Sequence, residues 1–533
     1  MKRRDFLKKV PLAAATTIIG GSTVQAYANS PMIQALTASL FETDRVLIVI
    51  QMSGGNDGLN TIIPLDQYDN LKAVRSNMLM DKSQVLKLND KTGIHPGMNR
   101  FKQLHDDGKL AVVQSVGYPN FNFSHFRATD IWMTGADSDK NLATGWLGRY
   151  LNYEYPNFPV GFPNAKMPDP LAIRMGGAGG VTTQVTGINM GYSLNGTPAS
   201  NLDLTNYLFQ DAAPATLAGK ELSFVREIMR QTDKFEDVVK TAYDKSKNLS
   251  TAYPTANNAP GLNLANQLKT VARCIAGGLK TRIYFLNTGG FDTHNSQVNG
   301  LDKSTGTHAN LLQGVSDAVY GFMDDIKLMG LENRVCGFTF SEFGRRIVSN
   351  SSIGTDHGAA APMFVFGAPI KAGVLGNSVV IDPKAANVNS NVPMQYDFRS
   401  VYASMLGDWF CVPKTDLDNI LLKNFQKLDI LDAINCIPVD VHETNNAAGE
   451  NMLTPYPNPF TETTTIKYET KGGNTQVSVF NNEGMLIQSL VNDTMEEGRY
   501  EVRCDLGDLP AGIYYVRLQN EKLQQVKPMI KVR

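Results

Sequence analysis

Short apolar runs that end in glycine-rich or acidic turns constrain the fold of this chain more than any other feature. The first run, Arg45–Gln51, leads directly into the turn Ser53–Gly58. A continuous apolar run of this length before such a turn is typical of a strand buried on both faces of a parallel sheet. The pattern recurs at Leu110–Val116, Thr281–Asn287, Arg334–Phe340 and Pro362–Gly367. We therefore predict that these runs form the central sheet.

Helical patterns separate the predicted strands. The clearest extends from Leu217 to Lys247, and a second runs from about Thr307 to Met329 with apolar residues at helical spacing. Strands that alternate with helices favour a mostly parallel sheet covered by helices on both faces. Residues 40–436 are predicted to form this single large α/β domain.

Acidic residues and histidines gather where the predicted strands end. Parallel strands present their carboxyl ends at one edge of the sheet, where ligands usually bind. Imidazole and carboxylate together suit Zn, Mn or Fe, and carboxylate-rich sites also take Ca or Mg. The sequence thus predicts a divalent metal site, of unspecified metal, with these candidate ligands: Asp57, Asp292, His294, Glu342, Asp356 and His357.

Ser124 and His125 follow the second strand and are the candidate catalytic residues. Phe126–Met133 has a helical pattern, and Ser124 is placed as its N-cap. The positive end of a helix dipole favours an anion, so a hydroxyl there could attack an anionic ester. Ser124 could equally be a simple cap, and His125 could be a core histidine. Two metal ions ~4 Å apart would clamp the attacking and leaving oxygens of such a displacement.

Five stretches of the chain, in order, resemble the DUF1501 family of exported bacterial proteins. That family is similar in turn to the alkaline phosphatase/sulfatase superfamily. The resemblance implies a Ser124 nucleophile and a metal site that includes Asp57, Asp292, His294, Glu342 and His357. The stretches are Gln51–Gly58, Asn122–Phe126, Gly289–His294, Ser341–Arg345 and Gly354–Gly358.

The chain departs from the superfamily in ways that leave alternatives open. The position of a late Asp-His pair reads Glu342-Phe343, and Asp356-His357 lies in a loop. The sulfatase signature Cys/Ser-x-Pro-x-Arg is absent, so a formylglycine nucleophile is not expected. Glu342 could instead form a buried ion pair with Arg345 or Arg346.

Some residues near the predicted site have two plausible roles. Asp57 lies in a turn where Asp is favoured for local hydrogen bonds alone. Arg127 and Arg345 are the candidate substrate-binding residues, because forked donors hold anions, although a solvated face is the alternative. The Phe121, Phe123 and Phe126 rings are expected in the core rather than as a substrate platform.

The N-terminus has the features of an export signal. Arg3-Arg4 precede a short apolar run, Val10–Gly21, and a small-residue cleavage site at Ala26–Ala28. Residues 1–28 resemble a twin-arginine signal peptide, with an ordinary secretory signal as the alternative. The run is shorter than the ~20 residues of a membrane helix, and no transmembrane segment is expected in the mature chain. The five cysteines show no metal-binding spacing, and the sequence selects no disulfide pair.

The last eighty or so residues have a different pattern. Residues 437–453 are polar and read as a linker. Residues 454–533 contain short alternating strands separated by turns, which predict a small β-sandwich. Three stretches resemble the type IX secretion sorting domain: Pro455–Pro459, Val479–Gly484 and Leu509–Tyr515. The resemblance implies recognition by the type IX secretion machinery after transit through the periplasm, and a final location at the cell surface or outside the cell.

Composition excludes one class of partner. The net charge of −1 and the lack of basic runs argue against nucleic acid. We therefore predict an exported, metal-dependent hydrolase of phosphate, phosphodiester or sulfate esters, acting on an anionic ester or glycan. The alternative is a non-catalytic cell-surface binding or assembly protein that retains the fold.

Overall fold

The computed structural model describes two compact units of the 533-residue chain. The described residues are 16–19 and 22–25, then 44–432, apart from 157, 160, 165–166, 178–179, 186, 199–212 and 215, and 453–532, apart from 482–485 and 521–523. Near the N-terminus, β1 (Thr16–Ile19) and β2 (Ser22–Gln25) pair antiparallel. The rest of the expected signal peptide 1–28, and all of the expected linker 437–453 except its last residue, lie outside the described residues, so both stay predictions.

A nine-stranded sheet forms the centre of the large unit, and the mostly parallel α/β fold is confirmed. All five strands predicted from apolar runs are present. Every neighbouring pair is parallel except the two that involve β14, which runs antiparallel to β13 and β7. The strands, in sheet order, are β11 (Gly191–Ser193), β8 (Ala172–Arg174), β12 (Ile283–Thr288), β3 (Val46–Met52), β13 (Val335–Phe340), β14 (Ala361–Gly367), β7 (Leu110–Gly117) and β15 (Gly373–Leu375), with β16 (Tyr396–Asp397) also on β7.

The single reversed strand has a consequence for the site. The parallel strands β3, β7, β12 and β13 end at one edge of the sheet, and β14 begins at that same edge. Residues just before Ala361 therefore lie beside residues that follow the parallel strands. This is how Asp356 and His357, which lie in a loop and not after a strand, can reach the same place as Asp292.

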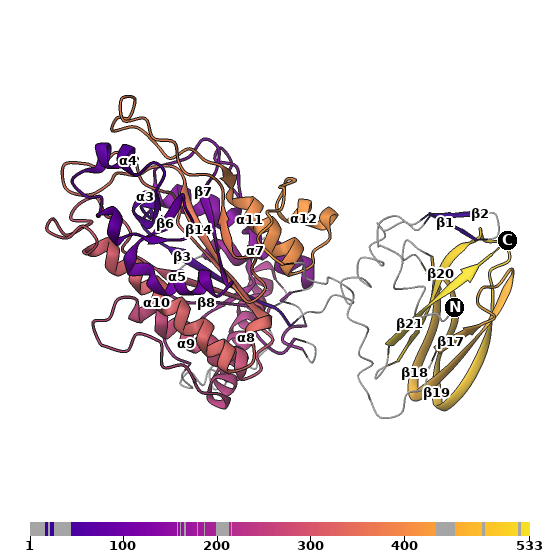
Figure 1. Ribbon diagram of the computed structural model, residues 1–533. Helices are drawn as coiled ribbons and strands as arrows, with labels where there is room; N and C mark the ends of the chain where they lie inside the picture. The colour runs from indigo at the N-terminus through magenta and orange to yellow at the C-terminus, as the bar shows by residue number, and fades with distance from the viewer. Residues whose placement is uncertain are drawn as a thin grey trace. The chain divides into compact units, whose positions relative to one another are not determined.

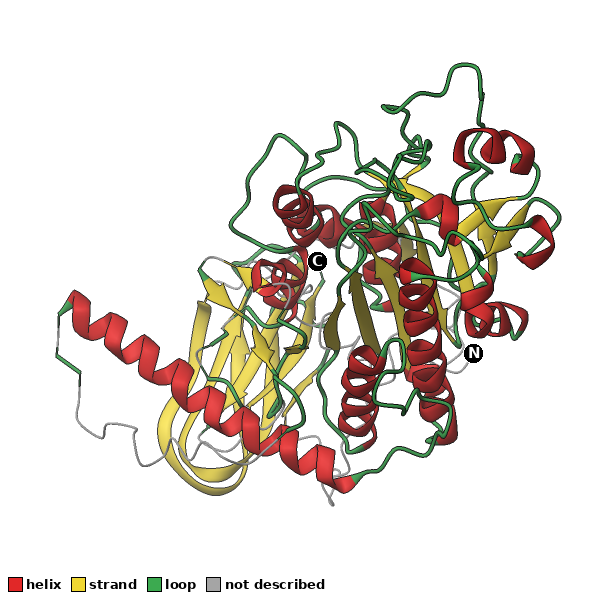
Figure 2. Cartoon of the chain, turned by 90° about the vertical axis from the view of Figure 1, so that its left-hand side faces the viewer, coloured by secondary structure: helices red, strands yellow, loops and turns green. Residues whose placement is uncertain are grey.

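Helices cover both faces of the sheet (Figure 1, Figure 2). Successive residues of β3 alternate between two hydrophobic clusters, as the two-residue period of a strand requires. On one face lie α7 (Trp146–Glu154), α11 (Phe398–Ser404), the π-helical turn Met405–Trp409 and α12 (Lys414–Ile420). On the other lie α5 (Asn99–Asp106), α8 (Leu217–Lys245), α9 (Leu262–Ala276) and α10 (Thr307–Leu328). The two helices predicted from the sequence correspond to α8 and α10.

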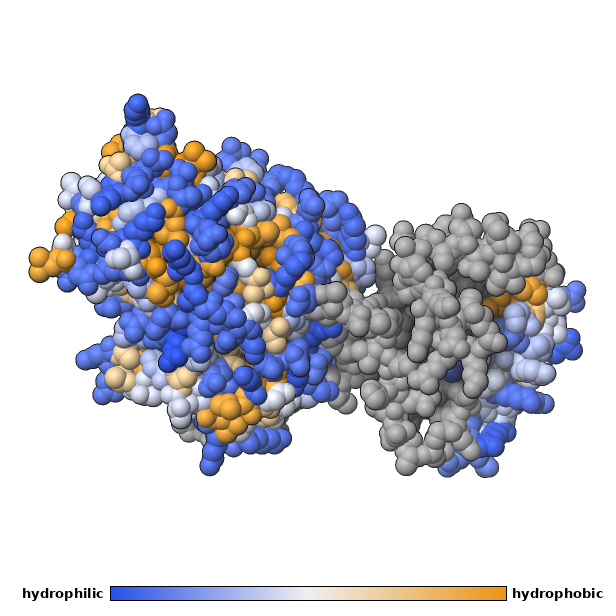
Figure 3. Space-filling view, in the orientation of Figure 1, coloured by the Kyte–Doolittle hydropathy of each residue, from blue (hydrophilic) through white to orange (hydrophobic). Residues whose placement is uncertain are grey.

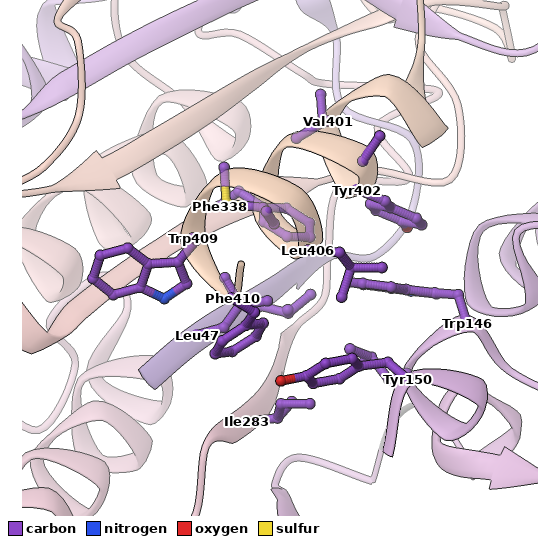
Figure 4. Packing of buried hydrophobic residues seen from close by; sticks show 14 of the residues in the cluster. Leu47, Trp146, Tyr150, Ile283, Phe338, Val401, Tyr402, Leu406, Trp409 and Phe410 are labelled. Atoms are coloured by element: carbon purple, nitrogen blue, oxygen red, sulfur yellow. The ribbon is translucent and has the colours of Figure 1, made fainter. Parts of the chain in front are cut away.

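Aromatic side chains fill the core beneath α7 and α11 (Figure 4). The rings of Trp146 and Tyr402 stack with centroids 4.0 Å apart, and those of Tyr150 and Phe410 stack at 5.0 Å. They pack on Leu47 and other strand residues of the same cluster. Burial of each large apolar side chain contributes roughly 1.5–3 kcal/mol, so this layer holds the sheet and its loops in place.

Smaller elements surround the sheet edge. They are α3 (Gly58–Thr61), α4 (Tyr68–Arg75), α6 (His125–Thr134), the three-stranded sheet β4 (Ile62–Pro64), β6 (Thr92–Ile94) and β5 (Leu86–Lys87), and the hairpin β9 (Gln184–Val185) with β10 (Ile188–Asn189). The face of the large unit seen in Figure 3 is mainly hydrophilic, with small separate apolar patches. Among the residues searched, none of the helices has the length and hydropathy needed to cross a bilayer.

The C-terminal unit is β-rich, as predicted. Its strands belong to one antiparallel sheet: β17 (Leu453–Tyr456), β18 (Thr463–Phe480), β19 (Leu486–Asp505), β20 (Gly512–Gln519) and β21 (Gln524–Lys531). The predicted small β-sandwich takes the form of one antiparallel sheet whose ends approach each other, since Phe460 N donates to Ile530 O at 2.9 Å. Ile466, Val477 and Val516 lie in the core that the sheet encloses.

Candidate metal centre

Four loops at one sheet edge carry the predicted site residues. They follow β3, β7, β12 and β13, and the last of them is the loop that connects β13 to β14. The loops approach closely only because one turn lacks a side chain: a Cβ on Gly54, whose φ is +125°, would lie 2.3 Å from Asp292 N. The glycine-rich turn after β3 therefore serves close packing against the turn after β12.

His125, Asp292 and His357 form the centre of the site. One ligand atom from each lies within 4.8 Å of the others. His357 Nε2 is 3.1 Å from Asp292 Oδ1, and His125 Nε2 is 3.4 Å from Asp292 Oδ2. The sequence assigned His125 to catalysis, whereas the structure groups it with the candidate ligands.

His294 extends this group to three imidazoles. Its Nε2 is 3.1 Å from Asp292 Oδ1 and 2.9 Å from His357 Nε2. Three residues from three different loops thus point their Nε2 atoms at one carboxylate. We call His125, His294, His357 and Asp292 the imidazole cluster.

The opposite nitrogen of each imidazole contacts an acceptor. His357 Nδ1 is 2.8 Å from Phe123 O, His125 Nδ1 is 2.8 Å from Glu342 Oε1, and His294 Nδ1 is 3.2 Å from Asp356 Oδ1. Carbonyl and ionised carboxylate oxygens only accept, so each Nδ1 carries the donated proton. A neutral imidazole then has its lone pair on Nε2.

This assignment makes the cluster unfavourable without a positive charge at its centre. Three lone pairs face an anionic oxygen or one another at about hydrogen-bond distance. Either protons on the Nε2 atoms or a cation among them removes the repulsion. Metal-ligating histidines commonly show this arrangement, with one nitrogen free for the metal and the other held by an acceptor. The donor set therefore fits a metal ion.

The charge states of the cluster agree with that fit. Partial burial alone would raise the pKa of Asp292, but the contributions that lower it, led by the hydrogen bond from Arg345, outweigh burial and bring the pKa to about 2. Burial lowers the pKa of His357 and so favours its neutral form. The hydrogen bond to Glu342 raises the pKa of His125. At neutral pH the cluster therefore contains an ionised aspartate and a neutral His357.

Glu342 and Asp356 lie behind the imidazoles. Glu342 is fully buried, and its Oε1 accepts from Gly54 N at 2.8 Å as well as from His125. Asp356 accepts from Asn350 and His294, and these hydrogen bonds, Asn350 first, help to lower its pKa. Both were predicted as direct metal ligands, and in the structure their carboxylates contact the Nδ1 atoms of His125 and His294.

Asp57 is not brought into the imidazole cluster. Its buried carboxylate accepts from Arg75 Nη1 at 2.8 and 2.9 Å and from Gln297 Nε2 at 2.6 Å. Burial would raise the pKa of Asp57, but Arg75 and His308 outweigh it and the pKa is lowered. A carboxylate neutralised in this way has no open lone pair directed at the cluster, so the expectation that Asp57 is a ligand has no support here.

The two arginines predicted to bind substrate have internal roles. Arg345 is 1 % exposed and donates to Gly55 O at 2.7 Å, Thr355 O at 2.7 Å and Asp292 Oδ1 at 2.6 Å. Arg127 pairs with Asp130 and donates to two backbone carbonyls. In the structure both guanidinium groups thus bond to other residues of the protein, and their role in substrate binding stays a prediction.

The segment around Ser124 is open to solvent. Ser124 is the exposed N-cap of α6, and its hydroxyl makes no cap hydrogen bond. Its role as nucleophile stays a prediction. Phe126 is 90 % exposed and Phe121 is 41 % exposed. The expectation that these two rings lie in the core is therefore wrong: Phe121 lies in the exposed loop before α6, and the start of α6 projects Phe126 outward while His125 turns inward.

Three buried residues beside the site were missed from the sequence. Arg75 neutralises Asp57, and Gln297 joins Asp57 to the ligand-bearing loops. His308 is buried between Asn56 and Asn60, and burial lowers its pKa to about 4. No motif marks them, since each is a single polar residue in a helix or loop. Only its burial distinguishes it, and burial cannot be read from spacing.

Comparison with protein families gives two matches. Residues 44–421 match the family described as proteins of unknown function, DUF1501. Residues 454–532 match the secretion system C-terminal sorting domain. No curated protein matches the chain.

Solved structures that resemble the chain include sulfatases and a phosphatase. A sulfatase from Pseudoalteromonas sp. has 11 % identity, covers 91 % of each chain and gives a TM-score of 0.33. A protein of glycosaminoglycan metabolism from Bacteroides thetaiotaomicron has 9 % identity, covers 84 % of this chain and 89 % of its own, and gives 0.33. Alkaline phosphatase from the Antarctic bacterium TAB5 has 8 % identity, covers 61 % and 92 %, and gives 0.23.

These scores are too low for any of the three to be a template for the site, which is therefore derived from this chain alone. The family match, in contrast, spans most of the chain, including all the loops that carry the imidazole cluster. On that match the chain belongs to the DUF1501 family, and it carries a secretion system C-terminal sorting domain.

Proposed function

We propose that the chain is an exported hydrolase of anionic esters that uses one divalent metal ion held by the imidazole cluster. The observation that supports this most is the convergence of three Nε2 atoms on the Asp292 carboxylate, with each Nδ1 held by an acceptor. Phosphate, phosphodiester and sulfate esters are the substrate classes. Residues 40–436 would carry the activity.

The ligand atoms of the imidazole cluster limit which metal ions could bind there. Three imidazoles and one carboxylate suit Zn or Mn, and also Fe. Ca and Mg prefer oxygen ligands and fit less well. When bound, such an ion supplies Lewis acidity toward an ester oxygen.

The chain's own residues would position and attack the ester. Ser124 is the proposed nucleophile, because its exposed hydroxyl directly precedes His125 at the start of α6. The amino end of that helix favours a developing anion. Arg345 would keep the Asp292 carboxylate in place through its 2.6 Å hydrogen bond.

Export would bring this site to its substrate. The sorting domain at residues 454–532 supports delivery by the type IX machinery to the cell surface or the extracellular space. The segment 1–28 would direct the earlier crossing into the periplasm by the twin-arginine route. The linker 437–453 would join the two domains.

The test is turnover of chromogenic aryl phosphates, phosphodiesters and sulfates by the zinc- or manganese-loaded protein. We expect hydrolysis of at least one class, reduced about 1,000-fold or more by Ser124→Ala. Ser138→Ala, in the loop after α6, is the control and should retain full activity. Absence of turnover with every ester and metal would contradict the hydrolase proposal.

A non-catalytic binding or assembly protein is the second candidate. One observation favours it: the apolar ring of Phe343 packs against His125 and His357, with centroids 4.9 and 4.6 Å away. The ring occupies a position beside the cluster where a polar residue would serve catalysis. This candidate predicts metal binding without turnover, and a pull-down from the cell envelope that Ser124→Ala leaves unchanged.

A further inference from the structure

We infer that Gln297 is a positioning residue that aligns the two loops bearing His294 and His357. Its side chain is fully buried and makes three hydrogen bonds. Oε1 accepts from Thr355 Oγ1 at 2.7 Å and from Thr293 Oγ1 at 3.1 Å, and Nε2 donates to Asp57 Oδ2 at 2.6 Å.

The two threonines lie beside candidate ligands. Thr293 separates Asp292 from His294, and Thr355 precedes Asp356 and His357. The direct backbone link between them, Thr355 N to Thr293 O, is long at 3.3 Å. Two further backbone bonds, Ser296 N to Ser352 O at 3.0 Å and Gln297 N to Ile353 O at 2.8 Å, join the same loops farther from the candidate ligands. The amide oxygen that accepts from both hydroxyls adds a link next to those ligands.

Asp57 and Arg75 anchor the other end of the amide. Asp57 can only accept, so it fixes Nε2 toward itself and leaves Oε1 for the threonines. Arg75 holds Asp57 and also donates to Ile347 O at 2.6 Å. The contacts run from Arg75 in α4 through Asp57 and Gln297 to Thr293 and Thr355 in the two loops, and all five side chains are buried.

Only glutamine satisfies both ends of this arrangement. Glutamate would place a second carboxylate against Asp57. Methionine, of similar length, would leave Asp57 with one donor fewer and the two hydroxyls without their acceptor, and an unpaired buried polar group costs about 1–3 kcal/mol. The loss should reach the imidazole cluster through the loops, without removal of any ligand.

The first experiment measures hydrogen exchange in the metal-free protein for Gln297→Met. Amides in residues 292–298 and 353–358 should both exchange at least about tenfold faster than in the wild type. The matched control is Gln267→Met, because Gln267 is also buried and also bonds a strand end, through Asn287 O at 3.0 Å. Faster exchange in only one of the two segments, or in neither, would overturn the inference.

The second experiment measures the zinc dissociation constant. Outer partners of metal ligands typically change affinity 10–100-fold, and we expect a rise of this size for Gln297→Met and less than twofold for Gln267→Met. Equal changes in the two variants would show a general loss of stability and contradict positioning. This arm rests on the proposed metal site: if the wild type binds no zinc, the proposed function fails and the exchange result alone decides the inference.

A pair of variants at Thr355 keeps the inference testable if Gln297→Met does not fold. Thr355→Val removes the 2.7 Å bond but keeps the side-chain volume, whereas Thr355→Ser keeps the hydroxyl. Valine should accelerate exchange across both segments, and serine should restore slow exchange. Equal behaviour of valine and serine would overturn the role of the hydrogen bond.

Discussion

Asp57 and Asp292 follow neighbouring strands of the same sheet in similar glycine-rich turns, yet they have opposite surroundings. Asp57 is fully buried against Arg75 and Gln297. Asp292 is 47 % exposed and faces three imidazoles and Arg345. A position at a strand end therefore does not decide whether an aspartate belongs to the site. That is decided by the residues that other segments of the chain place in contact with the aspartate.

These different surroundings define two groups of residues at the sheet edge. We call Asp57, Arg75 and Gln297 the lower layer, and the imidazole cluster the upper layer. In the lower layer, the charges of Asp57 and Arg75 neutralise each other, and the hydrogen bonds of Gln297 and Arg75 fix the positions of the surrounding loops. In the upper layer, the carboxylate of Asp292 has imidazole lone pairs directed at it, so it can bind a cation. The lower layer should matter most for stability and the upper layer most for metal affinity.

The largest expected effect is on folding. Asp57→Ala leaves Arg75 buried without a counterion, which typically costs about 3–5 kcal/mol of unfolding free energy. Asp292→Ala should cost less, on the order of 1 kcal/mol, because Asp292 is half exposed, so its removal admits water to Arg345, which keeps its hydrogen bonds to Gly55 O and Thr355 O. Urea unfolding of the metal-free protein measures both. Similar losses of unfolding free energy for the two substitutions would contradict the division into a lower and an upper layer.

For zinc affinity we expect the opposite order, with the larger effect at Asp292 and the smaller effect at Asp57. Asp292→Asn should raise the dissociation constant of zinc by about 100-fold or more, because it removes the one anionic ligand. Asp57→Asn should change it less than about tenfold. Competition with a chelating dye measures both constants, and an equal or larger effect of Asp57→Asn would contradict the assignment of ligands.

Acid should lower the stability of the protein, because it favours protonation of two buried histidines, His308 and His95. Burial lowers the folded-state pKa of His308 to about 4 and that of His95 to about 3, from an ordinary 6.5. The unfolded chain then binds protons first, so stability is complete above pH 6.5 and decreases as the pH falls toward 4. The lowered pKa of Asp57 acts in the same direction.

For the metal-free protein we expect a loss on the order of 5 kcal/mol between pH 7 and pH 4.5, because each of the two histidines contributes about 1.4 kcal/mol per pH unit over roughly the two units below 6.5. Replacement of His308 by Gln should reduce this dependence. An unfolding free energy that stays constant over that range would show that these histidines are not buried and neutral.

The smallest expected effect concerns the acceptors behind the imidazoles. Glu342→Gln keeps an oxygen for His125 Nδ1 but removes the charge, so zinc affinity should fall about tenfold. A loss as large as that of Asp292→Asn would instead make Glu342 a direct ligand, as the sequence had indicated. The same chelator competition decides between the two roles.

The apolar runs were sufficient to predict the central strands, because a parallel strand buried on both faces leaves a continuous hydrophobic stretch. The turns after them correctly marked the loops that meet, including those of Asp292, His294 and His357. Individual roles could not be predicted in the same way. That Asp57 pairs with Arg75 depends on where α4 packs, and that His357 reaches the site depends on β14 running antiparallel.

The outward direction of Phe126 was also beyond the sequence pattern. An aromatic residue next to His125 at the start of a helix reads as a core residue, and only the orientation of α6 shows that His125 faces inward and Phe126 faces solvent. Gln297 gave no signal for a related reason, because two of its three side-chain contacts are with distant residues, Asp57 and Thr355.

X-ray absorption at the zinc edge of the loaded protein tests the imidazole cluster most directly. One zinc per chain is predicted, with three imidazole nitrogens and one carboxylate oxygen around it and one imidazole fewer in His357→Gln. Zinc surrounded only by oxygen, an unchanged spectrum in His357→Gln, or no bound zinc would contradict the convergence of His125, His294 and His357 on Asp292 as a metal centre.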